Sequence, residues 1–191
     1  MGIRHTTPTF PHWNYFIALE EDLERASRYV ELVQANEKTY SLEFAHLLFA
    51  ASSEVETVMT LVCILFDPNT KANNFHACAK LLRKHFPRMW EEQVKLPRFG
   101  LTLRPWEEWK NNKGVPFWWM SYNHVKHERH SKFAEATMKN AVNALAALYL
   151  IVLELICRER RGDRLFVRDT REVMMTRVVP RPRLFDLAGR A

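Results

Sequence analysis

The chain has 191 residues, a length that suits one domain with a hydrophobic core and is short for two. Hydrophobic residues make up 47% of the sequence and aromatic residues 12%, which excludes an intrinsically disordered chain. The formal net charge is +6, and it is concentrated in residues 158–191, which hold ten arginines, five acidic residues and no lysine. A basic arm on a nearly neutral body is typical of phosphate-binding proteins, although a solvated tail or a subunit-docking arm gives the same pattern.

Three cysteines occur in apolar stretches of the sequence: Cys63, Cys78 and Cys157. An odd number of cysteines without Cys-x-x-Cys spacing argues against a disulfide framework or a zinc ribbon, and predicts small buried residues in a reducing compartment. Residues 1–13 contain no apolar run of the kind that a secretory signal needs. We therefore expect a cytoplasmic protein.

Apolar residues spaced three and four apart predict three helices in the first half of the chain. The first covers residues 13–36. The second covers residues 41–66, begins at Ser41, which is a good N-cap residue, and ends before Pro68. The third covers residues 73–85.

Proline and glycine interrupt residues 89–115 and predict a long inserted loop. Residues 94–106 fit a short extended pair, and residues 105–112 fit one or two turns of helix that begin at a proline. Five tryptophans lie in and around this loop: Trp90, Trp106, Trp109, Trp118 and Trp119. Because large aromatic side chains favour burial, we expect the loop to fold onto the body of the protein.

We predict a last major helix over residues 117–158, either continuous or bent. Its second half is nearly as long and apolar as a membrane span, but Asn140, Asn143 and Glu154 interrupt the apolar run. A buried helix explains this stretch better, so we expect no association with a membrane.

Together these elements predict an all-α fold, a four- to five-helix bundle. The bundle forms one domain over residues 1–158, with an inserted Trp-rich loop at about 89–115. Residues 159–191 follow as a basic C-terminal arm in which two segments, RLFVRD and TRVVPRPRLF, are expected to be extended.

Residues 118–131 combine an aromatic pair with a dense set of polar and basic side chains. In a helix, two neighbouring stripes carry these groups, with Asn123, His127 and His130 on one stripe and Tyr122, Lys126 and Arg129 on the other. Imidazole moves protons near neutral pH, and lysine and arginine bind phosphate and stabilise charge that develops on it. These groups suffice for plain phosphate binding or for metal-independent RNA cleavage.

Residues 122–129 (YNHVKHER), placed ahead of an apolar helix that contains NAVNAL, resemble the HEPN superfamily. The resemblance implies an all-α homodimer. Many members are ribonucleases of toxin and phage-defence systems, and others are non-catalytic binding or assembly domains. The family motif is an arginine, a polar residue, three further residues and a histidine. Asn123 matches the polar position and His127 the histidine, whereas Tyr122 stands in place of the arginine.

The resemblance implies His127 as the proton-transfer residue, with Asn123 orienting it or the substrate. The predicted catalytic residues are His127, Asn123, Lys126 and Arg129. The predicted substrate-binding residues are Tyr122, His130 and Glu54. Glu54 lies in the middle of the second helix, where it either faces the core and pairs with a cation or belongs to a solvated stripe. RNA, a second copy of the chain and a cognate protein partner are the expected partners.

The same residues allow two other interpretations, a metal site and a non-catalytic domain. His124, His127 and His130 recur every three residues, but no second ligand cluster has convincing spacing, so we expect no metal and no cofactor. Because Tyr122 replaces the motif's arginine, a non-catalytic helical homodimer or adaptor, in which the motif residues are structural, is the alternative to a ribonuclease.

Overall fold

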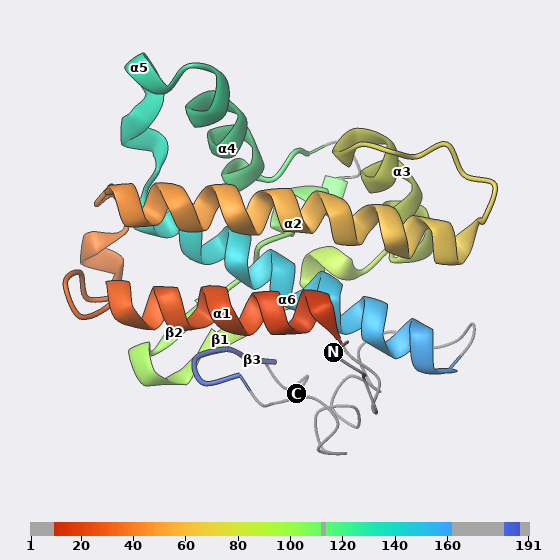
Figure 1. Cartoon of the computed structure of the whole chain (residues 1–191), viewed down its shortest axis with the longest axis horizontal. Helices are drawn as coiled ribbons and strands as arrows, with labels where there is room; N and C mark the ends of the chain where they lie inside the picture. Colours follow the sequence, from red (N-terminus) through yellow and green to blue (C-terminus); the bar gives the residue numbers. More distant parts are fainter. Residues whose placement is uncertain (1–9, 112–113, 162–181, 188–191) are drawn as a thin grey trace, which may run out of the picture.

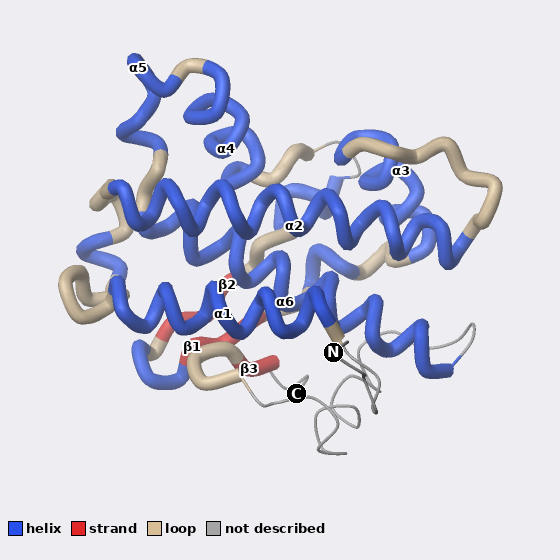
Figure 2. The backbone as a smooth tube through the Cα atoms, viewed as in Figure 1, coloured by secondary structure: helices blue, strands red, loops and turns tan. Residues whose placement is uncertain are grey.

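The computed structural model describes residues 10–111, 114–161 and 182–187. This part of the chain is mostly helical and forms six α-helices, with three short strands in one small sheet (Figures 1 and 2). The prediction of a helical protein is therefore confirmed, and the prediction of a purely α fold is wrong because the sheet is present.

Helix α1 (Pro11–Ala26) begins with a proline at its first turn and ends ten residues earlier than the sequence spacing predicts. The Ser27 hydroxyl donates to the Glu24 carbonyl (2.7 Å), and the following amides bond three residues back, which tightens the chain into a turn. Leu32, just after this turn, is fully buried. The apolar spacing beyond residue 26 therefore reflects a buried turn and not a longer helix.

Helix α2 (Leu42–Phe66) begins and ends where local signals predict. The Ser41 hydroxyl accepts from the Phe44 amide at 3.1 Å, which confirms the predicted N-cap. Helix α3 (Phe75–His85) has two caps, since the Asn74 side chain accepts from the Ala77 amide and Glu56 of α2 accepts from the Phe75 amide at 2.8 Å. Glu56 thereby fixes α3 against α2.

The inserted loop folds onto the body, as predicted. Strands β1 (Val94–Leu96) and β2 (Leu101–Leu103) pair antiparallel and confirm the expected extended pair. Gly100, with φ at +64°, supplies the left-handed turn residue between them. Trp106 and Trp109 of the loop are buried. Four 3-10 turns lie along the chain up to this point: Gln34–Asn36, Met89–Glu91, Pro97–Phe99 and Glu107–Asn111.

Strand β3 (Asp186–Leu187) returns from the C-terminal segment and pairs antiparallel with the free edge of β1, which gives the sheet order β2-β1-β3. Of the two predicted extended segments in the arm, residues 164–169 and most of residues 176–185 lie outside the described residues. Residues 182–187 pack against the body, where Leu184, Phe185 and Leu187 are buried.

The single helix predicted over residues 117–158 is divided in the structure. Helix α4 (Phe117–His127) ends at Glu128, the short helix α5 (Arg129–Lys132) and a 3-10 turn (Phe133–Glu135) follow, and helix α6 spans Met138–Arg161. Contacts with the distant loop before α2 fix the start of α6. The amides of Met138 and Lys139 donate to the carbonyls of Thr39 and Glu37 at 2.8 and 3.1 Å.

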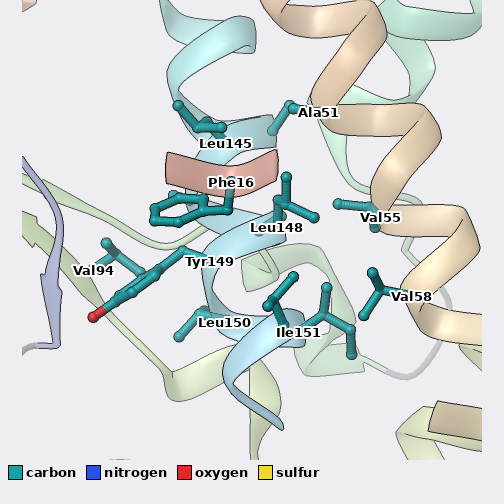
Figure 3. Close-up of a cluster of buried hydrophobic side chains, with 14 of the residues drawn as sticks. Phe16, Ala51, Val55, Val58, Val94, Leu145, Leu148, Tyr149, Leu150 and Ile151 are labelled. Carbon is teal, nitrogen blue, oxygen red and sulfur yellow. The ribbon is translucent and has the colours of Figure 1, made fainter. Parts of the chain in front are cut away.

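Helix α6 lies at the centre of the molecule, with its longest packing contact along α2 and further contacts with α1 and α4. Figure 3 shows Leu148 and Ile151 of α6 facing Val55 and Val58 of α2, while Tyr149 points to the other side of α6. By length and composition alone, two helices of the described part are apolar enough to cross a membrane, Leu42–Phe66 and Met138–Arg158. The apolar window of α6 is 100% buried, as in the core helix of a globular protein.

Candidate functional site

Helix α4 carries the predicted site and is held to the body by its aromatic face. Trp119 stacks on Phe75 at the start of α3, with ring centroids 3.8 Å apart. Trp118 is fully buried, and its indole nitrogen donates to the Pro105 carbonyl at 2.7 Å. Val125 is buried beside Ala45 of α2. These contacts leave the opposite face of α4 in solvent.

Tyr122, at the position of the motif's arginine, belongs to the buried face. It is 5% exposed, and its ring packs against Trp119 and against Phe49 of α2, with centroids 5.1 and 5.7 Å apart. The Lys126 ammonium folds back over this ring, at 5.2 Å from its centroid, and donates to the Tyr122 hydroxyl at 3.2 Å. Tyr122 and Lys126, predicted to be neighbours one helical turn apart, are therefore in contact. The Tyr122 ring, however, is part of the packed core, and only its hydroxyl reaches Lys126 at the surface.

Asn123 is half-buried, and its side-chain amide donates to the Trp119 carbonyl one turn earlier, at 2.9 Å. This hydrogen bond is internal to the helix. His127 is the last residue of α4 and is exposed. Because the helix ends there, the predicted stripe of Asn123, His127 and His130 does not continue along one helix.

The corner between α4 and α5 projects from the body (Figure 1). It carries four exposed basic side chains, which we call the basic tip: Lys126, His127, Arg129 and His130. Among the described residues, no carboxylate forms an ion pair with any of the four. Arg129 instead lies over the ring of Phe133, 5.2 Å from its centroid. Positive charge at the C-terminal turn of α4 is also favourable to the helix dipole.

Other basic residues near the tip are neutralised. His124 hydrogen-bonds to Glu135 at 2.8 Å, and the Lys132 ammonium lies 3.5 Å from the same carboxylate. Partial burial acts to raise the pKa of Glu135, but hydrogen bonds from His124 and Ser121, together with the charges of His124 and Lys132, outweigh it and hold the pKa below its usual value. His124 therefore has a carboxylate partner, unlike the four residues of the basic tip in the described part of the chain.

Glu54, predicted to bind substrate, is placed away from the tip. Its carboxylate hydrogen-bonds to Nδ1 of His12 at the start of α1, at 2.5 Å, with side-chain exposures of 17% and 23%. Figure 1 shows α1 and α4 on opposite sides of α2. One of the two interpretations of the sequence paired Glu54 with a cation, and the structure pairs it with the imidazole of His12. This pair lies away from the predicted site on α4.

The described residues contain no group of three or more histidine, cysteine, aspartate or glutamate side chains that could hold a metal ion. All three cysteines are buried. The hydrogen bond with Cys78 and burial raise the pKa of Cys63 and disfavour its thiolate. The same hydrogen bond, helped by Thr60 and opposed by burial, lowers the pKa of Cys78 to about 7.

Comparison with protein-family models, with curated proteins and with solved structures finds no match. The resemblance to the HEPN superfamily therefore rests on the motif around Asn123 and His127 and on the helical pattern.

Proposed function

We propose that the protein is RNA-directed and contacts the phosphate backbone of RNA through the basic tip of a HEPN-like helical bundle. One observation supports this most directly. The four basic side chains of the tip lie together in solvent without a carboxylate partner in the described part of the chain, whereas His124, Lys132 and Lys139 nearby have one. Unpaired surface cations next to each other favour a polyanionic partner.

Cleavage is a second candidate within the same proposal, supported by the exposed imidazole of His127 beside the ammonium of Lys126. In this reaction an imidazole takes the proton of the ribose 2′-hydroxyl, the resulting oxygen attacks phosphorus, and the leaving 5′-oxygen is protonated by a second acid. Lys126 stabilises the charge that develops on the phosphate oxygens. The burial of Tyr122 at the arginine position favours the alternative, a non-catalytic binding or adaptor domain that acts as a homodimer.

The binding proposal is tested with a charge-matched pair of variants. We expect Lys126→Ala combined with Arg129→Ala to weaken the binding of single-stranded RNA whatever the RNA sequence. The slope of the logarithm of the association constant against the logarithm of the salt concentration should become less steep by about 1 per phosphate contact removed. The control is Lys71→Ala combined with Lys80→Ala, which removes the same charge from exposed positions on another part of the surface. Fluorescence anisotropy at several salt concentrations measures both. Equal losses in the two double variants contradict a specific role of the tip.

Cleavage is tested separately by incubating RNA with wild-type protein and with His127→Ala in EDTA. Products from the wild type alone support metal-independent catalysis by His127. RNA that is bound but stays intact supports a non-catalytic binding domain and contradicts the ribonuclease hypothesis. Sedimentation of the wild type at several concentrations then decides whether the protein is a homodimer.

A further inference from the structure

The C-terminal residues 182–187, which we call the strap, are held on the body by a buried carboxylate. Glu20 of α1 is fully buried. Its carboxylate accepts hydrogen bonds from the backbone amides of Arg183, Leu184 and Phe185, at 2.8, 2.7 and 3.2 Å. A carboxylate that accepts several backbone amides in a buried setting forms strong, directional bonds. The strap is thus fixed at a defined place along α1.

Side-chain packing fixes the strap a second time. The Phe185 ring meets Phe16 of α1 edge-on, with centroids 5.6 Å apart, and lies 6.0 Å from the ring of Tyr149. Beyond it, β3 pairs with β1 (Figure 1). Because the backbone at Arg183 is held by Glu20 and the next residues are packed, the position of the Arg183 side chain follows from strap docking.

Docking of the strap brings Arg183 to an arginine-rich cleft. The cleft has a volume of about 620 Å³ and is lined by residues from α1 and the turn that follows it, from the turn between β1 and β2, and from the strap: Glu21, Glu24, Arg25, Arg28, Arg98 and Arg183. This volume lies within the range of about 300–1,000 Å³ that is usual for small-molecule sites. Three segments far apart in the sequence therefore build one basic concavity.

The charges in this cleft do not balance. Glu24 forms ion pairs with two arginines, because Arg98 donates to its carboxylate at 2.7 Å and Arg183 lies 3.5 Å from it. Arg183 also lies 3.8 Å from the carboxylate of Glu21. Arg25 pairs with Asp22. Within the described residues Arg28 has no ion pair. Four guanidinium groups line the cleft with two carboxylates, and once Asp22 is counted as the partner of Arg25, a surplus of one positive charge remains.

We propose that this cleft binds the phosphate chain of a small polyphosphate anion, and that docking of the strap completes the site through Arg183. Guanidinium groups present paired N–H donors that match phosphate oxygens in a bidentate manner. The surplus charge favours an anion, and four guanidinium groups around one cleft offer donors for several phosphate oxygens, more than a single carboxylate presents. The phosphate chain has two sources, a free polyphosphate or a nucleoside polyphosphate, and the probes below distinguish them.

Titration calorimetry of the full chain with tripolyphosphate at low salt tests the site. We expect the wild type to bind, and Arg28→Ala combined with Arg98→Ala to bind at least about a hundredfold more weakly, because each lost charged hydrogen bond weakens binding by about tenfold or more. The control is Lys80→Ala combined with Arg88→Ala, which removes two exposed charges outside the cleft. No binding by the wild type, or equal losses in both double variants, overturns the proposal.

The role of the strap is tested by Phe185→Ala, which removes packing and leaves every charge in place. We expect weaker tripolyphosphate binding in a protein whose circular dichroism stays helical. Glu20→Gln, which weakens the hold on the strap amides, serves as a second variant if the first does not fold. Wild-type affinity in a folded strap variant overturns the dependence on the strap.

Two further probes identify the ligand and separate this site from the basic tip. Tighter binding of ATP than of tripolyphosphate assigns the cleft to a nucleoside polyphosphate, and equal or weaker binding assigns it to a free polyphosphate. We expect the Arg28 and Arg98 double variant to keep the RNA affinity of the wild type. A loss of RNA affinity in that variant makes the cleft part of an RNA surface and overturns a separate small-anion site.

Discussion

Replacing Trp118 with alanine is expected to lower the free energy of unfolding by about 4 kcal/mol, as is typical for truncation of a large buried aromatic side chain. Trp118 is fully buried, meets the rings of Trp106 and Trp119 edge-on at 5.4 and 6.1 Å, and donates to the Pro105 carbonyl. The substitution leaves a cavity and removes the donor for that carbonyl. Urea denaturation followed by far-UV circular dichroism measures the loss.

The matched control for Trp118 is Met120→Ala, two residues further along the same helix. Met120 is 47% exposed, so its truncation is expected to change the stability by less than about 0.5 kcal/mol. Trp118 also ties α4 to the loop, so the variant is expected to weaken RNA binding at the basic tip and to increase proteolysis within residues 94–111. A Trp118→Ala protein as stable as the Met120 variant contradicts this account of how α4 is positioned.

Features governed by near neighbours in the chain could be predicted from the sequence. Ser41 caps α2 as expected, Pro68 follows its end, and the strand pair around Gly100 forms where it was placed. In each case the deciding interaction joins residues only a few positions apart. The helical spacing of Tyr122 and Lys126 likewise predicted their contact.

Features governed by distant contacts could not be predicted. Helix α6 starts at Met138 because its first amides bond to Thr39 and Glu37, about a hundred residues earlier. The strap docks because Glu20, one carboxylate among several in its helix, points inward to amides more than 160 positions away. Helical spacing does place Glu20 four residues after Phe16 and three before Leu23, on the buried face of α1, but it does not show which groups the carboxylate meets.

The candidate site shows the same division. Spacing alone grouped Asn123 with His127 and His130, but it could not show that α4 ends at His127 or that the Asn123 amide bonds to its own helix. It also could not place Glu54 beside His12. The arginine cleft was not predicted, because its members come from α1 and the turn after it, from the turn between β1 and β2, and from the strap.

The second large effect concerns Glu154, a buried carboxylate on α6. Its side chain is 5% exposed, and burial raises its pKa to about 7, although Arg158 donates to it at 2.5 Å and acts to lower the pKa. The negative charge of Glu92 also raises it. The Arg158 guanidinium is itself enclosed, at 3.9 Å from the ring centroid of Phe66 and 4.9 Å from that of Phe86.

The stability of the folded state is therefore expected to fall as the pH rises through the range between the ordinary pKa of glutamic acid, near 4.5, and about 7. In that window the folded protein keeps a proton on Glu154 that the unfolded chain has released, so raising the pH favours unfolding. The contribution is fully present below the unfolded pKa and is lost as the pH passes the folded pKa. At about 1.4 kcal/mol per pH unit, the loss amounts to about 3 kcal/mol.

Glu154→Gln isolates this contribution, since glutamine keeps the size and an acceptor for Arg158 and cannot ionise. We expect the free energy of unfolding of the variant to change less with pH than that of the wild type, and the two curves to diverge in favour of the variant as the pH approaches 8. Urea denaturation between pH 5 and about 8 measures both, and the difference cancels groups that the two proteins share. Glu43→Gln, at an exposed position of α2, is the control and should follow the wild type. Parallel curves for wild type and Glu154→Gln would show that the carboxylate is ionised in the folded protein, held by Arg158 against the cost of burial.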